Sequence, residues 1–245
     1  MATNAMSIGV RTWCVGVIVP AHNEEATIDA CIKSILRSIA KARVEKYWLV
    51  VVADQCTDRT VERARGALGC DGEVLEISAR SPGAARRAGA ARVLRHWESP
   101  EPSRIWLANT DADSYVNDDW IAVQLALADE GVTAVAGIVR LGADGSAAVH
   151  EVYRRTYLTN AEGTHTHVHG ANLSVRADAY EDVGGWSDLA LAEDHCLWGR
   201  LRRRGWRVSS PVSSVVTTSA RLQGRAAGGF ADTLKARLEA QHAKP

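Results

Sequence analysis

The sequence predicts one α/β domain, in which helices cover both faces of a mixed central sheet. Two continuous apolar runs, residues 13–20 and 47–53, are rich in Val and Ile, which is typical of strands buried on both faces of a parallel sheet. Between them, apolar residues recur every three or four positions from Ile28 to Ile39, which places them on one face of a helix. The 245 residues, 46% of them hydrophobic, are enough to form one core without a second folding unit.

The rest of the first half continues the same alternation of strands and helices. Strands are expected over residues 73–78 and 104–110, and helices over residues 61–68 and 82–97. A further helix follows the fourth strand, with Asn117 as its cap.

The second half of the sequence lacks this repeat and is typical of an α+β arrangement. Its expected elements are a strand over 133–140, a helix over 149–159, an alternating stretch over 165–176, a helix over 192–205, a short strand over 206–209 and a helix over 230–240. No internal repeat or low-complexity segment interrupts these elements.

The composition excludes several classes of function. Lys and Arg together number 29, as do Asp and Glu, so the chain has no overall basic field that would attract nucleic acid. Five cysteines without a Cys-x-x-Cys pair favour reduced thiols over a disulfide framework. The N-terminal residues lack a basic run followed by an apolar segment, and no apolar stretch approaches the roughly 20 residues of a membrane span. The sequence therefore predicts a soluble, cytoplasmic protein, with peripheral membrane contact and the oligomeric state left open.

An acidic pair, Asp111 and Asp113, directly follows the fourth strand. Because parallel strands bind ligands outside their carboxyl ends, segments 20–25, 53–58 and 110–114 are expected to converge on one crevice. Two carboxylates held there need a cation between or beside them. Hard oxygen ligands suit Mg²⁺ or Mn²⁺, which also accept phosphate oxygens. Asp-x-Asp alone most often marks a solvated turn, and its position at a strand end is what favours a metal site here.

Six short motifs occur in one order along the chain: Pro20-Ala21-His22-Asn23-Glu24, Asp54-Gln55-Cys56-Thr57-Asp58, Gly83 to Gly89, Asp111-Ala112-Asp113, Gly184-Gly185-Trp186 and Glu193-Asp194. In this order the chain resembles the bacterial, soluble family 2 glycosyltransferases of the GT-A fold, a Rossmann-like architecture. The resemblance covers roughly residues 13–210, and six ordered motifs are far more specific than any one of them.

The resemblance implies a role for individual residues. It places a set of side chains around the donor nucleotide: Pro20, Ala21, Glu24, Asp54, Asp58, Arg86, Asp111, Ala112 and Asp113. It implies that Asp111 faces the ribose and the metal, and that Asp113 binds the metal beneath the diphosphate. The catalytic pair would be Glu193 and Asp194, with Asp194 as general base, and Gly185 and Trp186 would shape the acceptor side.

The implied reaction is metal-dependent transfer of a sugar from a nucleotide-sugar donor to a hydroxyl acceptor. A leaving diphosphate needs a cation, and the incoming hydroxyl needs a carboxylate base. One base and no second nucleophile favour inversion, while retention stays open. Ala53-Asp54 stands where many relatives carry paired acids, so UDP is the default donor nucleotide and GDP the alternative.

The Gln-x-x-Arg-Trp signature of processive synthases is absent, which favours one transfer to a small or lipid-linked acceptor. The expected organisation is a nucleotide-binding half over about 13–115, an acceptor-binding half over about 116–220, and a C-terminal loop and helix over 221–245.

Several candidates rest on weaker patterns. His165, His167 and His169 alternate, so on a strand they would share one face over about 13 Å. A single acceptor or metal contact, by His169, is favoured over a three-histidine zinc site. His195 is either a third metal ligand or an exposed histidine on a helix. Arg221, together with Arg225 in a Gly-rich segment, is a candidate lid residue for the diphosphate.

Two other functions are alternatives to this one. A sugar-phosphate nucleotidyltransferase would need a Gly-rich, basic phosphate loop after the first strand, but residues 21–25 are acidic and contain no glycine. A catalytically inactive GT-A binding module is the third interpretation, and the intact Asp111, Asp113 and Asp194 argue against it.

Overall fold

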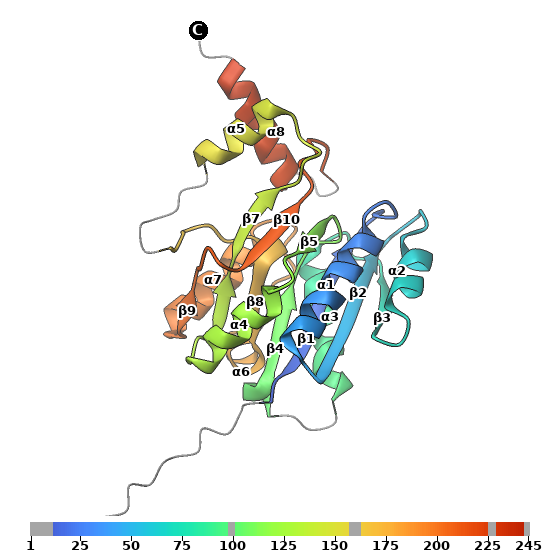
Figure 1. Ribbon diagram of the computed structural model, residues 1–245, viewed down its shortest axis with the longest axis vertical. Coiled ribbons are helices and arrows are strands. Elements are labelled where there is room, and N and C mark those ends of the chain that lie inside the picture. The colour runs from blue at the N-terminus through green and yellow to red at the C-terminus, as the bar shows by residue number, and fades with distance from the viewer. Residues whose placement is uncertain (1–11, 98–100, 157–162, 225–228, 243–245) are drawn as a thin grey trace, which may run out of the picture.

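The computed structural model describes residues 12–97, 101–156, 163–224 and 229–242 (Figure 1). The first half consists of β1 (Cys14–Ala21), α1 (Ile28–Ala42), β2 (Lys46–Asp54), α2 (Thr60–Leu68), β3 (Gly72–Ile77), α3 (Pro82–His96), a 3₁₀ turn η1 (Pro102–Arg104) and β4 (Ile105–Asn109). The strands and helices expected in this half are confirmed to within a few residues at their ends.

The second half consists of β5 (Ser114–Val116), α4 (Trp120–Asp129), β6 (Ala134–Ala136), β7 (Ile138–Leu141), α5 (Ala147–Thr156), a 3₁₀ turn η2 (Gly170–Asn172), β8 (Leu173–Arg176), α6 (Ala177–Asp182), α7 (Glu193–Arg204), β9 (Val208–Ser209), β10 (Val215–Thr218) and α8 (Phe230–His242). The predicted helix over 149–159 corresponds to α5, and residues 157–159 of it lie outside the described residues.

The large sheet has the strand order β3-β2-β1-β4-β8-β6-β9, and a small sheet has the order β5-β10-β7. β1 pairs in parallel with β2 and β4, whereas β8 runs antiparallel to β4 and β6. The expected mixed sheet is therefore confirmed.

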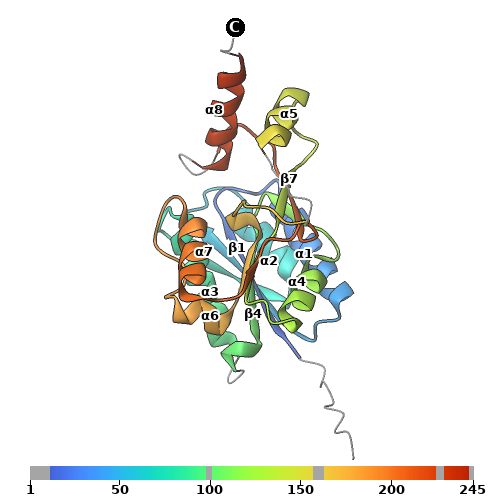
Figure 2. The same cartoon turned by 90° about the vertical axis from the view of Figure 1, so that its left-hand side faces the viewer.

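Helices cover both faces of the large sheet, as Figure 2 shows from the side: α1, α2 and α4 lie on one face, and α3, α6 and α7 on the other. The alternation of side chains between the two faces of β1 explains this. Val15, Val17 and Val19 point into the core under α1, while Ile18 points into the core under α3, and all four are fully buried.

Helices α5 and α8 pack against each other beyond the end of the small sheet (Figures 1 and 2). Their contact is a separate apolar cluster built on Val149, Tyr153 and Leu234, with Ala220 from the loop after β10. Among the described residues, no helix is both long and apolar enough to span a bilayer.

Three expectations about the second half are corrected. Residues 133–140 are not one strand, because the chain leaves the large sheet at Gly137 and enters the small one. A Cβ at this glycine would lie 2.3 Å from Asn172 Nδ2, so only glycine allows this close approach. Of residues 165–176, only 173–176 form a strand. Asn117 is not the cap of α4, because the N-cap is Asp119; the backbone carbonyl of Asn117 accepts from Trp120 N at 3.0 Å in the turn before the helix.

Candidate active site

A cavity of about 1060 Å³ opens at the carboxyl ends of β1, β2 and β4. The three polar segments expected to converge all contribute to its wall: Pro20, Ala21 and Glu24 after β1, Asp54 at the end of β2, and Asp111, Ala112 and Asp113 after β4. The second half of the chain completes the wall with residues from the loop before η2, the start of α7, the loop after β10, and α8. The predicted crevice therefore exists, and both halves of the chain form it.

Arg86, on the buried face of α3, holds one side of the cavity together. Its Nη2 donates to Asp111 Oδ1 at 2.6 Å, and its Nη1 donates to Glu193 Oε1. The guanidinium lies 5.4 Å from the centre of the Trp186 ring, and the residue is 3% exposed. Because Asp111 follows β4 and Glu193 begins α7, this one side chain joins the two halves of the site.

A second arginine, Arg221, pairs with Glu24 and Asp113. Its Nη1 and Nη2 donate to the two carboxylate oxygens of Glu24 at 2.9 and 2.5 Å, and Nη2 also lies 3.0 Å from Asp113 Oδ2. The loop that carries Arg221 is fixed by Asp144, whose carboxylate accepts from Ser219 Oγ and from Ala220 N.

Asp113 carries the electrostatic signature of a crowded acidic site. Burial, with the nearby charges of Asp111 and Glu24, raises its pKa to about 6, while Arg221 acts in the opposite direction. Thr218 donates to Asp113 Oδ1 at 3.3 Å. Paired carboxylate oxygens in this setting fit a hard divalent cation.

The wider predicted metal set does not form. Among the residues that the structure describes, no three His, Cys, Asp or Glu side chains are grouped as metal ligands. His195 lines the cavity as an exposed side chain of α7, but it does not complete a three-ligand site with Asp111 and Asp113. The residues therefore fit a cation held by two carboxylates, with further oxygens supplied by a phosphate ligand.

The two acids at the start of α7 have different surroundings. Glu193 is 7% exposed and bonded to Arg86, and burial raises its pKa against the charge of that arginine. Asp194 is half-buried, and its two oxygens accept from Gly170 N at 2.8 Å and His195 N at 2.6 Å. Both carboxylates line the cavity. Glu193 is paired with the buried Arg86, whereas Asp194 accepts from backbone N–H groups.

Asp54 marks another end of the cavity. Its carboxylate accepts from Ala79 N at 2.8 Å and Ser81 N at 3.0 Å, so it fixes the turn between β3 and α3. Arg80, in that turn, lines the cavity with an exposed side chain and a left-handed backbone (φ 50°). Asp58 does not line the cavity, because its oxygens accept from Glu25 N and from Thr60.

The three alternating histidines do share one face, although they are not on a strand. The rings of His165 and His167 are stacked 6.0 Å apart, and those of His167 and His169 are stacked 6.1 Å apart. His167 and His169 line the cavity. Burial lowers the pKa of His169 to about 4 against the attraction of Asp194, so its imidazole is neutral at pH 7.

The predicted acceptor residues Gly185 and Trp186 do not reach the cavity. Gly185 has φ +65°, and a Cβ there would lie 2.5 Å from the Tyr180 ring. The chain turns inward at this glycine and buries Trp186, which is 1% exposed, against Arg86. Arg225 lies outside the described residues.

Two arginines of the cavity wall, Arg80 and Arg237, are among the residues that the sequence did not predict there. Arg80 follows β3, so the same strand-end rule that found Asp111 could have found it. Arg237 lies on α8, and nothing in its local sequence says where that helix packs.

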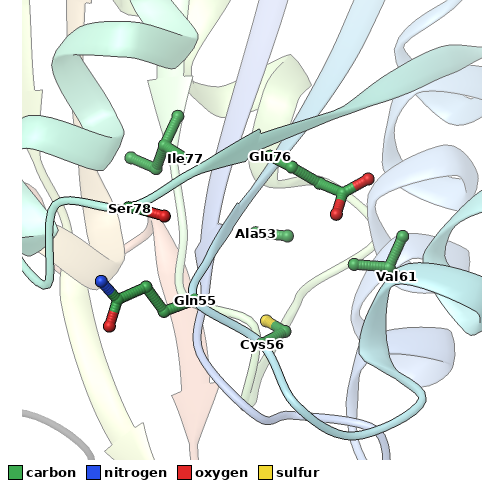
Figure 3. A pocket seen from close by; sticks show the side chains of 7 residues that line it. All are labelled: Ala53, Gln55, Cys56, Val61, Glu76, Ile77 and Ser78. Carbon is green, nitrogen blue, oxygen red and sulfur yellow. The ribbon is translucent and has the colours of Figure 1, made fainter.

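A smaller cavity of about 400 Å³ lies at the carboxyl ends of β2 and β3 (Figure 3). Its lining residues are Ala53, Gln55, Cys56, Val61, Glu76, Ile77 and Ser78. None of the predicted site residues is among them.

The sequence is similar to those of known glycosyltransferases. The family model described as glycosyltransferase-like family 2 matches residues 13–238. A probable glycosyltransferase of Bacillus subtilis strain 168, YdaM, is 26% identical over 204 residues, which are 79% of this chain and 48% of that protein. The chain thus spans about half the length of this curated relative.

Two solved structures have a similar fold. TarS of S. aureus, residues 1–349 in complex with UDP-GlcNAc, superimposes with a TM-score of 0.67 at 15% identity, covering 89% of this chain and 61% of that one. The mannosyltransferase PcManGT of Pyrobaculum calidifontis, in complex with GDP-Man and Mn²⁺, gives 0.63 at 22% identity, with 93% and 61% covered. The two structures show that this chain has the GT-A fold. The family match over residues 13–238 shows that the chain belongs to glycosyltransferase family 2.

Proposed function

We propose that this chain transfers a sugar from a nucleotide-sugar donor to a hydroxyl acceptor, with the help of a divalent cation and with inversion at the anomeric carbon. The observation that supports this most is the placement of Asp111 and Asp113 in one cavity with Asp194. The first two suit a cation and a diphosphate, and the third suits proton removal. The ligands named for the two similar structures, UDP-GlcNAc in one and GDP-Man with Mn²⁺ in the other, agree with this chemistry.

The donor nucleoside would lie against Pro20, Ala21 and Asp54, near Arg80. The carboxylate of Asp54 is held in place by two backbone N–H groups, which leaves its oxygens oriented for a base N–H donor. UDP is the first donor nucleotide to test and GDP the second.

Asp111 and Asp113 would hold Mn²⁺ or Mg²⁺. When bound, the ion supplies positive charge to the leaving diphosphate. Arg221 lines the same part of the cavity and offers hydrogen-bond donors to a diphosphate.

Asp194 would act as the general base. Its carboxylate accepts hydrogen bonds from the backbone N–H groups of Gly170 and His195, which fix it at the start of α7. The acceptor oxygen forms a bond to the anomeric carbon, the bond from that carbon to the diphosphate oxygen breaks, and the acceptor proton passes to Asp194. With one such base, direct displacement inverts the configuration. The acceptor is a small or lipid-linked alcohol, and the enzyme works in the cytoplasm.

Thermal stabilisation by UDP-, GDP- and dTDP-sugars, with and without Mn²⁺, tests this proposal. One donor class should raise the melting temperature, because a ligand at 100 times its Kd stabilises a protein by about 2.7 kcal/mol. It should do so only when Mn²⁺ is present, because the cation holds the diphosphate. Asp113→Ala should remove this stabilisation. If no nucleotide sugar shifts the melting temperature, or if Asp113→Ala responds like the parent, the proposed function is wrong.

A further inference from the structure

The side chain of Arg221 is bound to the acids that the proposed function assigns to the donor and its cation. It makes two hydrogen bonds to Glu24 and lies 3.0 Å from Asp113 Oδ2. The side chains of Glu24 and Asp113 are 6% and 14% exposed, so one guanidinium pairs with two largely buried carboxylates. Without it, both charges would lie close together in a poorly solvated place.

The two arginines of the site differ in how firmly they are held. The guanidinium of Arg86 is enclosed by Trp186 and by the backbone at Gly170, where a Cβ would lie 2.5 Å from Arg86 Nη2. Arg221 is 27% exposed, and its side chain lines the cavity itself. It extends from an irregular loop that is bonded to Asp144 through Ser219 and Ala220 and packs against the α5–α8 cluster through Leu222. Arg86 is thus a fixed support, whereas the side chain of Arg221 has open cavity beside it.

A divalent cation on Asp113 and the guanidinium of Arg221 compete for the same oxygen region. Asp113 Oδ1 already accepts from Thr218, and Arg221 lies against Oδ2. Two cations within a few ångströms of each other repel strongly where solvent screening is weak. The contact between Arg221 and Asp113 must therefore loosen when a cation binds there.

We propose that Arg221 is the resident counter-ion of Glu24 and Asp113 in the donor-free protein and exchanges with the divalent cation when the nucleotide diphosphate binds. The inference rests on the proposed function. In the donor-free protein, Arg221 weakens binding of the cation. In the complex, the diphosphate provides a new acceptor for Arg221, so the cation and the nucleotide bind cooperatively. Because such coupling is reciprocal, the nucleotide tightens cation binding by the factor by which the cation tightens nucleotide binding.

Titration of Mn²⁺ with Arg221→Gln, with and without UDP or GDP, tests the exchange. The variant should bind Mn²⁺ alone about tenfold more tightly than the parent, and the tightening of Mn²⁺ by the nucleotide should shrink by about tenfold. Calorimetry, or the electron paramagnetic resonance signal of free Mn²⁺, measures both affinities without turnover. Arg221→Lys keeps the charge and should bind Mn²⁺ alone more weakly than Arg221→Gln does.

Arg204→Gln is the matched control, because Arg204 forms a similar two-bond pair with Asp182 and neither residue lines the cavity. It should leave both Mn²⁺ affinities unchanged. If Arg221→Gln binds Mn²⁺ alone no more tightly than the parent does, or if Arg204→Gln has the same effect as Arg221→Gln, the exchange is refuted. If the parent binds neither nucleotide in the presence of Mn²⁺, the proposed function itself fails. Comparing Arg221→Lys with the parent covers the case in which Arg221→Gln does not fold.

Discussion

Glu193 and Asp194 are adjacent in the sequence, but their contacts predict opposite effects of mutation. Glu193→Gln removes one carboxylate from the buried Arg86, and breaking a buried ion pair costs about 3 kcal/mol of unfolding free energy. Asp194→Asn should keep the stability and donor affinity of the parent, while transfer falls at least about 100-fold for want of a base. Urea unfolding and single-turnover transfer measure the two effects. A stable but inactive Glu193→Gln beside an active Asp194→Asn would reverse the assignment.

Among single residues, the sequence predicted those side chains whose position follows from the backbone alone. Asp111 and Asp113 come directly after a buried strand, so their place at the sheet edge follows from the strand. Trp186 was placed at the acceptor by its motif, but the direction of its side chain depends on the left-handed turn at Gly185 and on the packing of Arg86. A contact between segments 107 residues apart, such as that of Arg86 with Glu193, leaves no local signal in either segment.

Among the elements, the change of sheet at Gly137 depends on a narrow space. Gly137→Ala would place a Cβ 2.3 Å from Asn172 Nδ2 and 2.5 Å from Ser214 O. Asn172 Nδ2 donates to Ile138 O and Ser214 O there, so the insertion disturbs a buried hydrogen-bond network. We expect a loss of about 3 kcal/mol or more in unfolding free energy.

Gly66→Ala is the matched control for this substitution. Gly66 lies within α2, and a Cβ there would meet nothing within 4 Å. Since alanine has a better helix propensity than glycine, the control should gain roughly 0.5–1 kcal/mol. Equal stability of the two variants in urea would show that the space at Gly137 is not tight.

Long elements were predictable from the sequence because their patterns repeat, and short ones were not. β5 and β10 have three and four residues and α6 has six, which is too few for a period of two or 3.6 to be distinguished. The stretch 165–176 alternates along its whole length, but only its last four residues find ladder partners in β4 and β6. Strand pairing depends on the neighbouring strand, and β6 is only three residues long.

For the whole molecule, three apolar clusters of different size predict uneven stability. The α5–α8 cluster is small and separate from the two cores of the large sheet. Leu234, which is 2% exposed, is its central residue on α8. Leu234→Ala should therefore accelerate amide hydrogen exchange in α5 and α8 at least about tenfold, while exchange in β1 and β2 stays unchanged. Faster exchange throughout the large sheet would show that the molecule opens as a single unit.

The middle position of β10 in the small sheet also has a consequence for chain synthesis. β5 and β7 both pair with β10 and not with each other, so the small sheet needs a strand that leaves the ribosome late. Thr218, which donates to Asp113, is 105 residues further along the chain, and Arg221 follows it. Contacts of such long sequence separation form slowly and only after both segments are available. A nascent chain therefore carries Glu24 and Asp113 without their positive partner until Arg221, 197 residues after Glu24, has been translated.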